Sequence, residues 1–246
     1  MTIQPDSTVD LPTPNGPMRV HLFIPTGEGK HPALIFYSEI FQVTGPIRRM
    51  AATLAGNGYL VAVPEVYHEF EPAGTVLAYD QAGSDRGNEL KYAKTLASYD
   101  ADTAALAEFL VDHSRSTGKI GSFGVCLGGH LAVRAALHPL VRATVAFYPT
   151  DLHSATLGAG KSDNTLTRIS EAQSPFCFVF GRQDPHVSLE GRRVIQARLE
   201  EARVAFEWHE FNAAHAFLRD EGLRYNPALA RLSLELLFQF YAEQLA

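Results

Sequence analysis

The sequence has little cysteine. Only Cys126 and Cys177 occur among its 246 residues, and two thiols are too few for the disulfide scaffold of a small secreted protein. Neither has histidines or cysteines around it at the spacing of a structural zinc site. We therefore expect no metal and no organic cofactor, and we treat each cysteine as either a small buried residue or a reactive thiol.

Long hydrophobic runs and runs of basic residues are also missing. No apolar stretch approaches the ~20 residues of a membrane-spanning helix, and Met1–Asp10 is polar, unlike a signal peptide. The formal net charge is −6, with acidic and basic residues mixed along the chain, so neither nucleic acid nor a membrane surface is an expected partner. We expect a cytoplasmic enzyme, and a monomer because no heptad or apolar seam is evident.

The composition is that of a globular protein, with 46% hydrophobic and 20% charged residues. Short apolar runs alternate with helical stretches, which predicts one α/β domain over residues 1–246 with a mostly parallel sheet and helices on both faces. The predicted strands are Met18–Ile24 (antiparallel), Ala33–Tyr37, Tyr59–Val63, Lys119–Phe123, Ala143–Phe147, Pro175–Phe180 and Val204–Phe211 (near a sheet edge). The predicted helices are Ile47–Ala55, Asp100–His113, Leu127–Leu137, Val187–Ala202 and Pro227–Leu245.

Two segments give weaker signals. Residues 65–98 are polar and contain several glycines, which favours loop with a short helix. Residues 151–171 separate two predicted strands without a clear element of their own. Ligands of parallel sheets bind beyond the carboxyl ends of the strands, so we expect both segments to wall a pocket there, the first with Tyr67, Phe70 and Tyr79.

The strongest motif is Gly124-Val125-Cys126-Leu127-Gly128-Gly129, between a predicted strand and a predicted helix. It is the G-x-S-x-G nucleophile elbow with cysteine in the serine position. Glycines two residues before and after the nucleophile avoid collisions in the tight turn, and the helix that follows favours the thiolate form of Cys126. The amide of Leu127 could face a developing oxyanion. Cys177 lies mid-strand without glycines, which indicates a core residue.

The elbow predicts a catalytic acid and then a histidine, each after a later strand. Asp184 follows the strand Pro175–Phe180, with a helix N-cap as its alternative role; Glu190 and Asp151 are weaker candidates. His215 follows the strand Val204–Phe211 on a loop of small residues. We predict that His215 accepts the proton of the Cys126 thiol and that Asp184 fixes its tautomer.

Together these motifs resemble the dienelactone hydrolase family of the α/β-hydrolase fold, over nearly the whole chain. Further marks are Ser38-Glu39-Ile40-Phe41, Gly181-Arg182-Gln183-Asp184 and His215-Ala216-Phe217. The resemblance implies that Glu39 contacts the cysteine and helps to switch it between thiol and thiolate. It also implies that the amide of Ile40 is the second oxyanion donor beside Leu127.

The resemblance further implies hydrolysis of a lactone or carboxylic ester through a thioester intermediate, without a metal or organic cofactor. The family's founding activity converts dienelactone to maleylacetate. That substrate carries a carboxylate, which two arginines hold in the family; Arg219 occupies the position of one, and Arg86, in the middle segment, is a candidate for the other.

Three alternatives stay open at this point. The chain could be a general carboxylesterase or thioesterase for small acyl groups. It could be a non-catalytic protein of the α/β-hydrolase fold that binds a small molecule or a partner, although the intact triad argues against this. Finally, Cys126 could be a redox-sensing thiol, which would not need His215.

Overall fold

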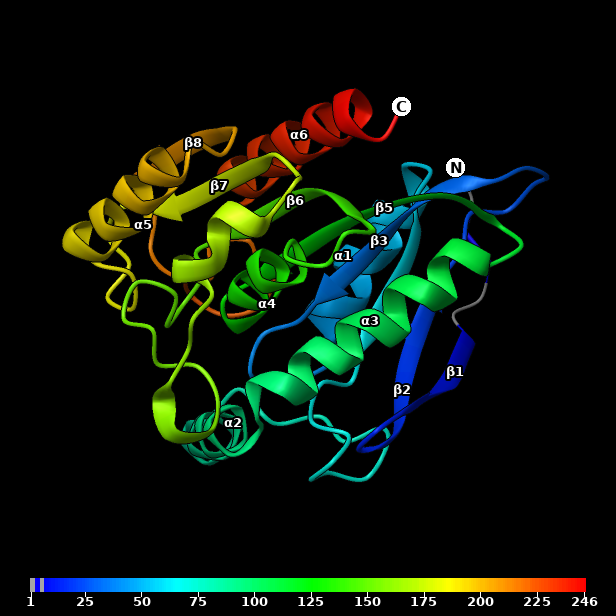
Figure 1. Cartoon of the computed structure of the whole chain (residues 1–246), viewed down its shortest axis with the longest axis horizontal. Helices are drawn as coiled ribbons and strands as arrows, with labels where there is room; N and C mark the ends of the chain where they lie inside the picture. The colour runs from blue at the N-terminus through cyan, green and yellow to red at the C-terminus, as the bar shows by residue number, and fades with distance from the viewer. Residues whose placement is uncertain (1–2, 5–6) are drawn as a thin grey trace.

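The computed structural model describes residues 3–4 and 7–246, and its centre is a single eight-stranded sheet (Figure 1). The strands lie in the order β1-β2-β4-β3-β5-β6-β7-β8. The strand β2 pairs antiparallel with β1 and β4, and all pairs from β4 to β8 are parallel. The strands are β1 (Ser7–Thr13), β2 (Gly16–Phe23), β3 (His31–Tyr37), β4 (Leu60–Pro64), β5 (Ser116–Val125), β6 (Val141–Phe147), β7 (Phe176–Gly181) and β8 (Phe206–Phe211).

Helices cover both faces of this sheet, and each face has its own hydrophobic core. Residues of α1 and α6 pack together on one face, and residues of α3, α4 and α5 pack on the other, where Figure 1 shows α3 and α4 in front of the strands. The helices are α1 (Gly45–Gly56), α2 (Gln81–Ala93), α3 (Leu96–Asp112), α4 (Leu127–Ala135), α5 (Leu189–Ala202) and α6 (Pro227–Gln244), with the 3₁₀ helices η1 (Ala159–Lys161) and η2 (Leu166–Glu171).

This architecture confirms the predicted fold class. Every predicted strand is present, β2 is antiparallel, and β8 lies at a sheet edge. The central strands β3, β4 and β7 are almost wholly buried because helices cover both of their faces. Among the described residues, no helix is both long enough and apolar enough to cross a membrane.

One element was not predicted, and another is longer than predicted. The polar segment Ser7–Thr13 forms the edge strand β1, because the turn at Gly16 returns the chain as β2 and supplies its pairing partner. The middle segment holds a full helix, α2, where we predicted a short one. The sequence of α2 has few apolar residues and so shows no clear helical pattern. In the structure, the Asp80 side chain caps the N-terminus of α2 by accepting a hydrogen bond from the Gly83 amide.

Candidate active site

Cys126 lies at a tight turn between β5 and α4. Its backbone has φ 59° and ψ −123°, a conformation that a residue other than glycine adopts only where the surrounding structure holds it. Its amide donates to the Phe147 carbonyl (3.1 Å), and its carbonyl accepts from the amides of Gly129 (3.0 Å) and Thr150 (3.2 Å). The turn is therefore fixed from β6 and α4, and Cys126 is partly exposed while Cys177 is buried.

The two glycines of the motif permit close packing around this turn. A Cβ atom at Gly124 would lie 1.8 Å from the Gly128 carbonyl oxygen, and one at Gly128 would lie 2.0 Å from the Tyr37 carbonyl oxygen. The second contact shows that the first turn of α4 is pressed against the carboxyl end of β3. Glu39 and Ile40, which follow β3, line the cavity in front of Cys126, and Leu127 is the first residue of α4.

His215 and Asp184 approach Cys126 from the loops after β8 and β7. The His215 Nδ1 atom lies 2.6 Å from Asp184 Oδ2, and both side chains are nearly inaccessible. The other oxygen of Asp184 accepts from the amides of His186 (2.7 Å) and Val187 (3.2 Å). Burial alone would raise the pKa of Asp184, but the hydrogen bond and charge of His215, followed by the two amide hydrogen bonds, lower it below its ordinary value, so Asp184 is ionised at neutral pH.

His215 is strongly biased toward its protonated form. Burial opposes this charge, but the interaction and hydrogen bond with Cys126, together with the Asp184 carboxylate, outweigh it and raise the pKa of His215 to about 10. The ring is also held by edge-to-face contacts with Tyr148, at 4.8 Å between centroids, and with His186, at 4.7 Å. The structure thus places His215 beside Cys126 and joins it to Asp184 by a hydrogen bond.

Glu39 reaches the same cavity but has other partners than predicted. Its Oε2 atom accepts a hydrogen bond from the Tyr79 hydroxyl (2.9 Å), and its Oε1 atom lies 3.8 Å from Arg219 Nη1. The Arg219 guanidinium also stacks over the Tyr79 ring at 4.1 Å. Burial raises the pKa of Glu39, with Arg219 and Tyr79 opposing. In this structure the hydrogen bond of the Glu39 carboxylate therefore goes to Tyr79 and not to Cys126.

These groups surround a cavity of about 620 Å³ at the carboxyl ends of the strands. The middle segment walls it through Tyr79 and α2, as expected, whereas Tyr67 and Phe70, also predicted to wall it, do not line it. Residues 150–154 form another wall. The lining residues are Glu39, Ile40, Phe41, Tyr79, Asp80, Gln81, Ser84, Asn88, Lys91, Cys126, Thr150, Asp151, His153, Ser154, His186, His215, Ala216, Arg219, Leu223 and Arg224. Its size fits a small organic substrate.

The three basic side chains of the lining differ in their partners. Lys91 is paired with Asp151 at 2.7 Å and is nearly buried. Arg219 faces Glu39 only loosely, as described above. Arg224 is exposed and has no ion-pair partner within residues 3–4 and 7–246, although its charge acts on both Glu39 and His186. Arg219 and Arg224 are therefore the cations most available to an anionic ligand.

The remaining predicted residues lie elsewhere. Arg86 does not line the cavity; its guanidinium binds Glu71 (2.7 Å) and Glu89 (2.8 Å) on the outer side of α2. Of the alternative acids, Glu190 is exposed on α5 near Arg193, and Asp151 is held by Lys91. Neither contacts His215, which leaves Asp184 as its carboxylate partner.

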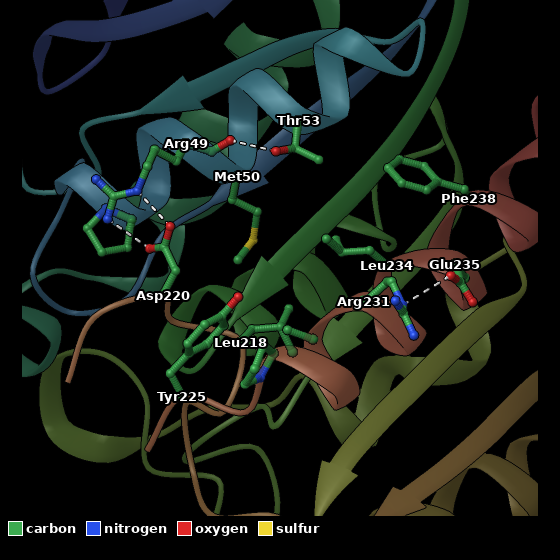
Figure 2. Close-up of a pocket in the computed structure, with 13 residues that line it drawn as sticks. Arg49, Met50, Thr53, Leu218, Asp220, Tyr225, Arg231, Leu234, Glu235 and Phe238 are labelled. Atoms are coloured by element: carbon green, nitrogen blue, oxygen red, sulfur yellow. Dashed lines mark hydrogen bonds and ion pairs between the residues drawn. The ribbon is translucent and has the colours of Figure 1, made fainter. Parts of the chain in front are cut away.

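A second cavity of about 340 Å³ lies between α1, α6 and residues 218–227 (Figure 2). Figure 2 shows the Asp220 carboxylate facing the Arg49 guanidinium at its rim, with a bidentate contact of 2.6 and 2.8 Å. The loop that follows His215 therefore separates the two cavities, and this ion pair ties the loop to α1.

The comparison with known proteins agrees with the geometry. Residues 18–245 match the model of the dienelactone hydrolase family. The chain belongs to this family. Members similar to it include a protein of Saccharomyces cerevisiae that is provisionally named carboxymethylenebutenolidase, 41% identical over 93% of this chain and 87% of its own. The carboxymethylenebutenolidase of Pseudomonas putida is 26% identical over 86% of this chain and 85% of its own.

A solved structure supports the same fold. The crystal structure of a provisionally named dienelactone hydrolase from Klebsiella pneumoniae superposes with a TM-score of 0.83, at 22% identity, over 97% of this chain and 98% of the other. The resemblance to the dienelactone hydrolase family inferred from the motifs is thus confirmed.

Several residues of this family member's cavity were not predicted from sequence. Thr150, whose hydroxyl lies 4.0 Å from Cys126 Sγ, comes shortly after the end of β6, and this position was the available signal. Arg224 follows His215 on the same loop, but an exposed arginine in a loop has no distinguishing pattern. Lys91 could not be placed because the helix that carries it was not predicted in full.

Proposed function

We propose that Cys126, His215 and Asp184 are the catalytic triad of this enzyme, a hydrolase of lactones or carboxylic esters. The observation that carries the proposal is the chain of contacts from Asp184 through His215 to Cys126 at the floor of one substrate-sized cavity. The pKa of His215, raised to about 10, supports a protonated imidazole ring beside the Cys126 sulfur at neutral pH. This ring can supply a proton to the leaving group after the sulfur has attacked.

In the proposed mechanism, the Cys126 sulfur attacks the substrate carbonyl carbon and forms a C–S bond. The amides of Leu127 and Ile40 stabilise the resulting oxyanion, each contributing about 3 kcal/mol to lowering the barrier. The C–O bond to the leaving group breaks, and protonated His215 supplies its proton. Water, deprotonated by His215, then attacks the thioester, which releases the acid and restores the thiol sulfur.

We further propose that the substrate carries a carboxylate held by Arg219 and Arg224. Support comes from the loose pairing of Arg219 with Glu39 and from the uncompensated charge of Arg224 beside the cavity. A substrate carboxylate near Arg219 would compete with Glu39 for it. The role predicted for Arg86 is not retained, since two carboxylates already bind its guanidinium.

The test is hydrolysis of a panel of lactones and esters by the wild type and by Cys126→Ala, His215→Ala and the control His113→Ala at the distant end of α3. We expect kcat/KM to fall at least about 10³-fold for the first two variants and to stay unchanged for the control. Hydrolysis that persists in Cys126→Ala would refute the assigned nucleophile. Hydrolysis that needs Cys126 but not His215 would refute the triad.

A further inference from the structure

Cys177 is the cysteine that the proposed mechanism does not use. It lies on β7, whose register places it directly opposite Glu207 on β8, and Val179 opposite His209. Alternate residues of a strand share a face of the sheet, so Cys177, Glu207 and His209 lie on the same face. The sequence shows no local motif for this group, because strand pairing brings together residues that are about 30 positions apart.

The three side chains lie close to the distances that a small metal ion requires. One ligand atom from each of Cys177, Glu207 and His209 lies within 4.8 Å of the others, and His209 Nε2 is 3.3 Å from Glu207 Oε2. Around tetrahedral Zn²⁺, two nitrogen or oxygen donors are about 3.3 Å apart, and a sulfur donor is about 3.6 Å from each of them. The nitrogen–oxygen pair already fits, and the sulfur must move closer to the other two atoms by at most about 1.2 Å.

We propose that Cys177, Glu207 and His209 bind a divalent transition-metal ion of the zinc type, with water as the fourth ligand. Thiolate, imidazole and carboxylate together suit Zn²⁺ or Co²⁺ and are unsuited to Mg²⁺ or Ca²⁺, which prefer oxygen ligands. This site lies apart from the catalytic cavity, and none of its three residues lines that cavity.

The position of the group allows an ion to enter from solvent. The strand β8 is the edge of the sheet, and the side chains of His209 and Glu207 are 27% and 47% exposed, while Cys177 is buried beneath them. Burial and then the charge of Glu207 raise the pKa of the Cys177 thiol to about 12. Binding must therefore replace the thiol proton, which passes to the buffer as the metal–sulfur bond forms.

The ion would join the two strands that carry the acid and the base of the triad. The strand β7 leads to Asp184, and β8 leads to His215. Because the ion binds the folded chain only, where the three ligands meet, it should raise the melting temperature.

The experiment is a Co²⁺ titration of Cys126→Ser, in which Cys177 is the only remaining thiol. We expect a thiolate-to-Co²⁺ charge-transfer band that saturates at one ion per chain. It should disappear in Cys126→Ser/Cys177→Ala. Adding Glu207→Ala or His209→Ala should weaken Co²⁺ binding at least tenfold, whereas adding His113→Ala should leave it unchanged.

Two results would overturn the proposal. One is the absence of the band with millimolar Co²⁺ in folded Cys126→Ser. The other is a band of unchanged affinity after loss of Glu207 or His209, which would mean that the ligands are elsewhere. Since both side chains are partly exposed, their variants remain informative even if the Cys177 variant does not fold. A rise of the wild-type melting temperature with Zn²⁺, lost in both variants, is the expected second measurement.

Discussion

The hydrogen bond between Asp184 and His215 offers a quantitative test of the triad. Asp184→Asn preserves the size of the side chain but removes the negative charge that lies 2.6 Å from His215 Nδ1. The asparagine can also present an N–H group to this nitrogen, which favours the wrong imidazole tautomer. Both effects act on the ring that must hold and release the proton of Cys126.

The magnitude follows from the environment of His215. The rise of its pKa from 6.5 to about 10 corresponds to about 5 kcal/mol of preference for the protonated ring. Cys126 contributes most of the favourable interactions and Asp184 the next part, while burial opposes them. We therefore expect Asp184→Asn to lower the pKa of His215 by about 1 to 2 units, and kcat/KM at neutral pH to fall about 10²- to 10⁴-fold.

The sign of the pH dependence is fixed by the direction of this shift. A raised pKa keeps His215 protonated, and able to protonate the leaving group, until the pH rises through about 10. The assay is kcat/KM against pH with a neutral ester, which does not itself titrate. We expect an alkaline decline near pH 10 in the wild type and at lower pH in Asp184→Asn. An unchanged decline, or one equally moved by the control Asp112→Asn at the exposed end of α3, would refute the reasoning.

Three further predictions concern the walls of the cavity and the helix turn that follows Cys126. Arg219→Ala and Arg224→Ala should each lower kcat/KM about 10-fold or more for anionic lactones and much less for neutral esters of equal size; equal losses on both would instead favour a general carboxylesterase. Gly128→Ala should lower the free energy of unfolding by about 3 kcal/mol or more, measured in urea, because its Cβ would lie 2.0 Å from a β3 carbonyl oxygen. Gly45→Ala, which meets only a flexible side chain, is its control. Tyr79→Phe should cost about 1 to 3 kcal/mol in the same assay, because a buried carboxylate loses its donor; no change would contradict the assigned hydrogen bond.

Most of the fold could be predicted because the sequences of the central strands are uninterrupted apolar runs, which indicate burial on both faces. Runs such as Ala33–Tyr37 and Phe176–Phe180 are apolar without interruption, as strands covered on both faces must be. The elements that were missed gain their stability from partners. The strand β1 is polar and depends on pairing with β2, and α2 depends on packing such as that of Gly87 against the Ile40 backbone.

The site divides in the same way. That Cys126, Asp184 and His215 lie together could be predicted because each follows a recognisable strand, and strand order places their loops at one edge of the sheet. The partners of charged side chains could not be predicted, because a long side chain can reach several neighbours and only the folded structure shows which of them it contacts. Arg86 forms ion pairs with Glu71 and Glu89. Arg224 lines the cavity and has no ion pair among the described residues.

The central claim is that Cys126 forms a thioester during turnover, and mass spectrometry of acid-quenched protein tests it most directly. Protein quenched during hydrolysis of a lactone or ester should gain the mass of the acyl group, and peptide mapping should place the group on Cys126. His215→Ala should reduce formation of this adduct. Turnover without any adduct on Cys126, or an adduct on another residue, would contradict the account.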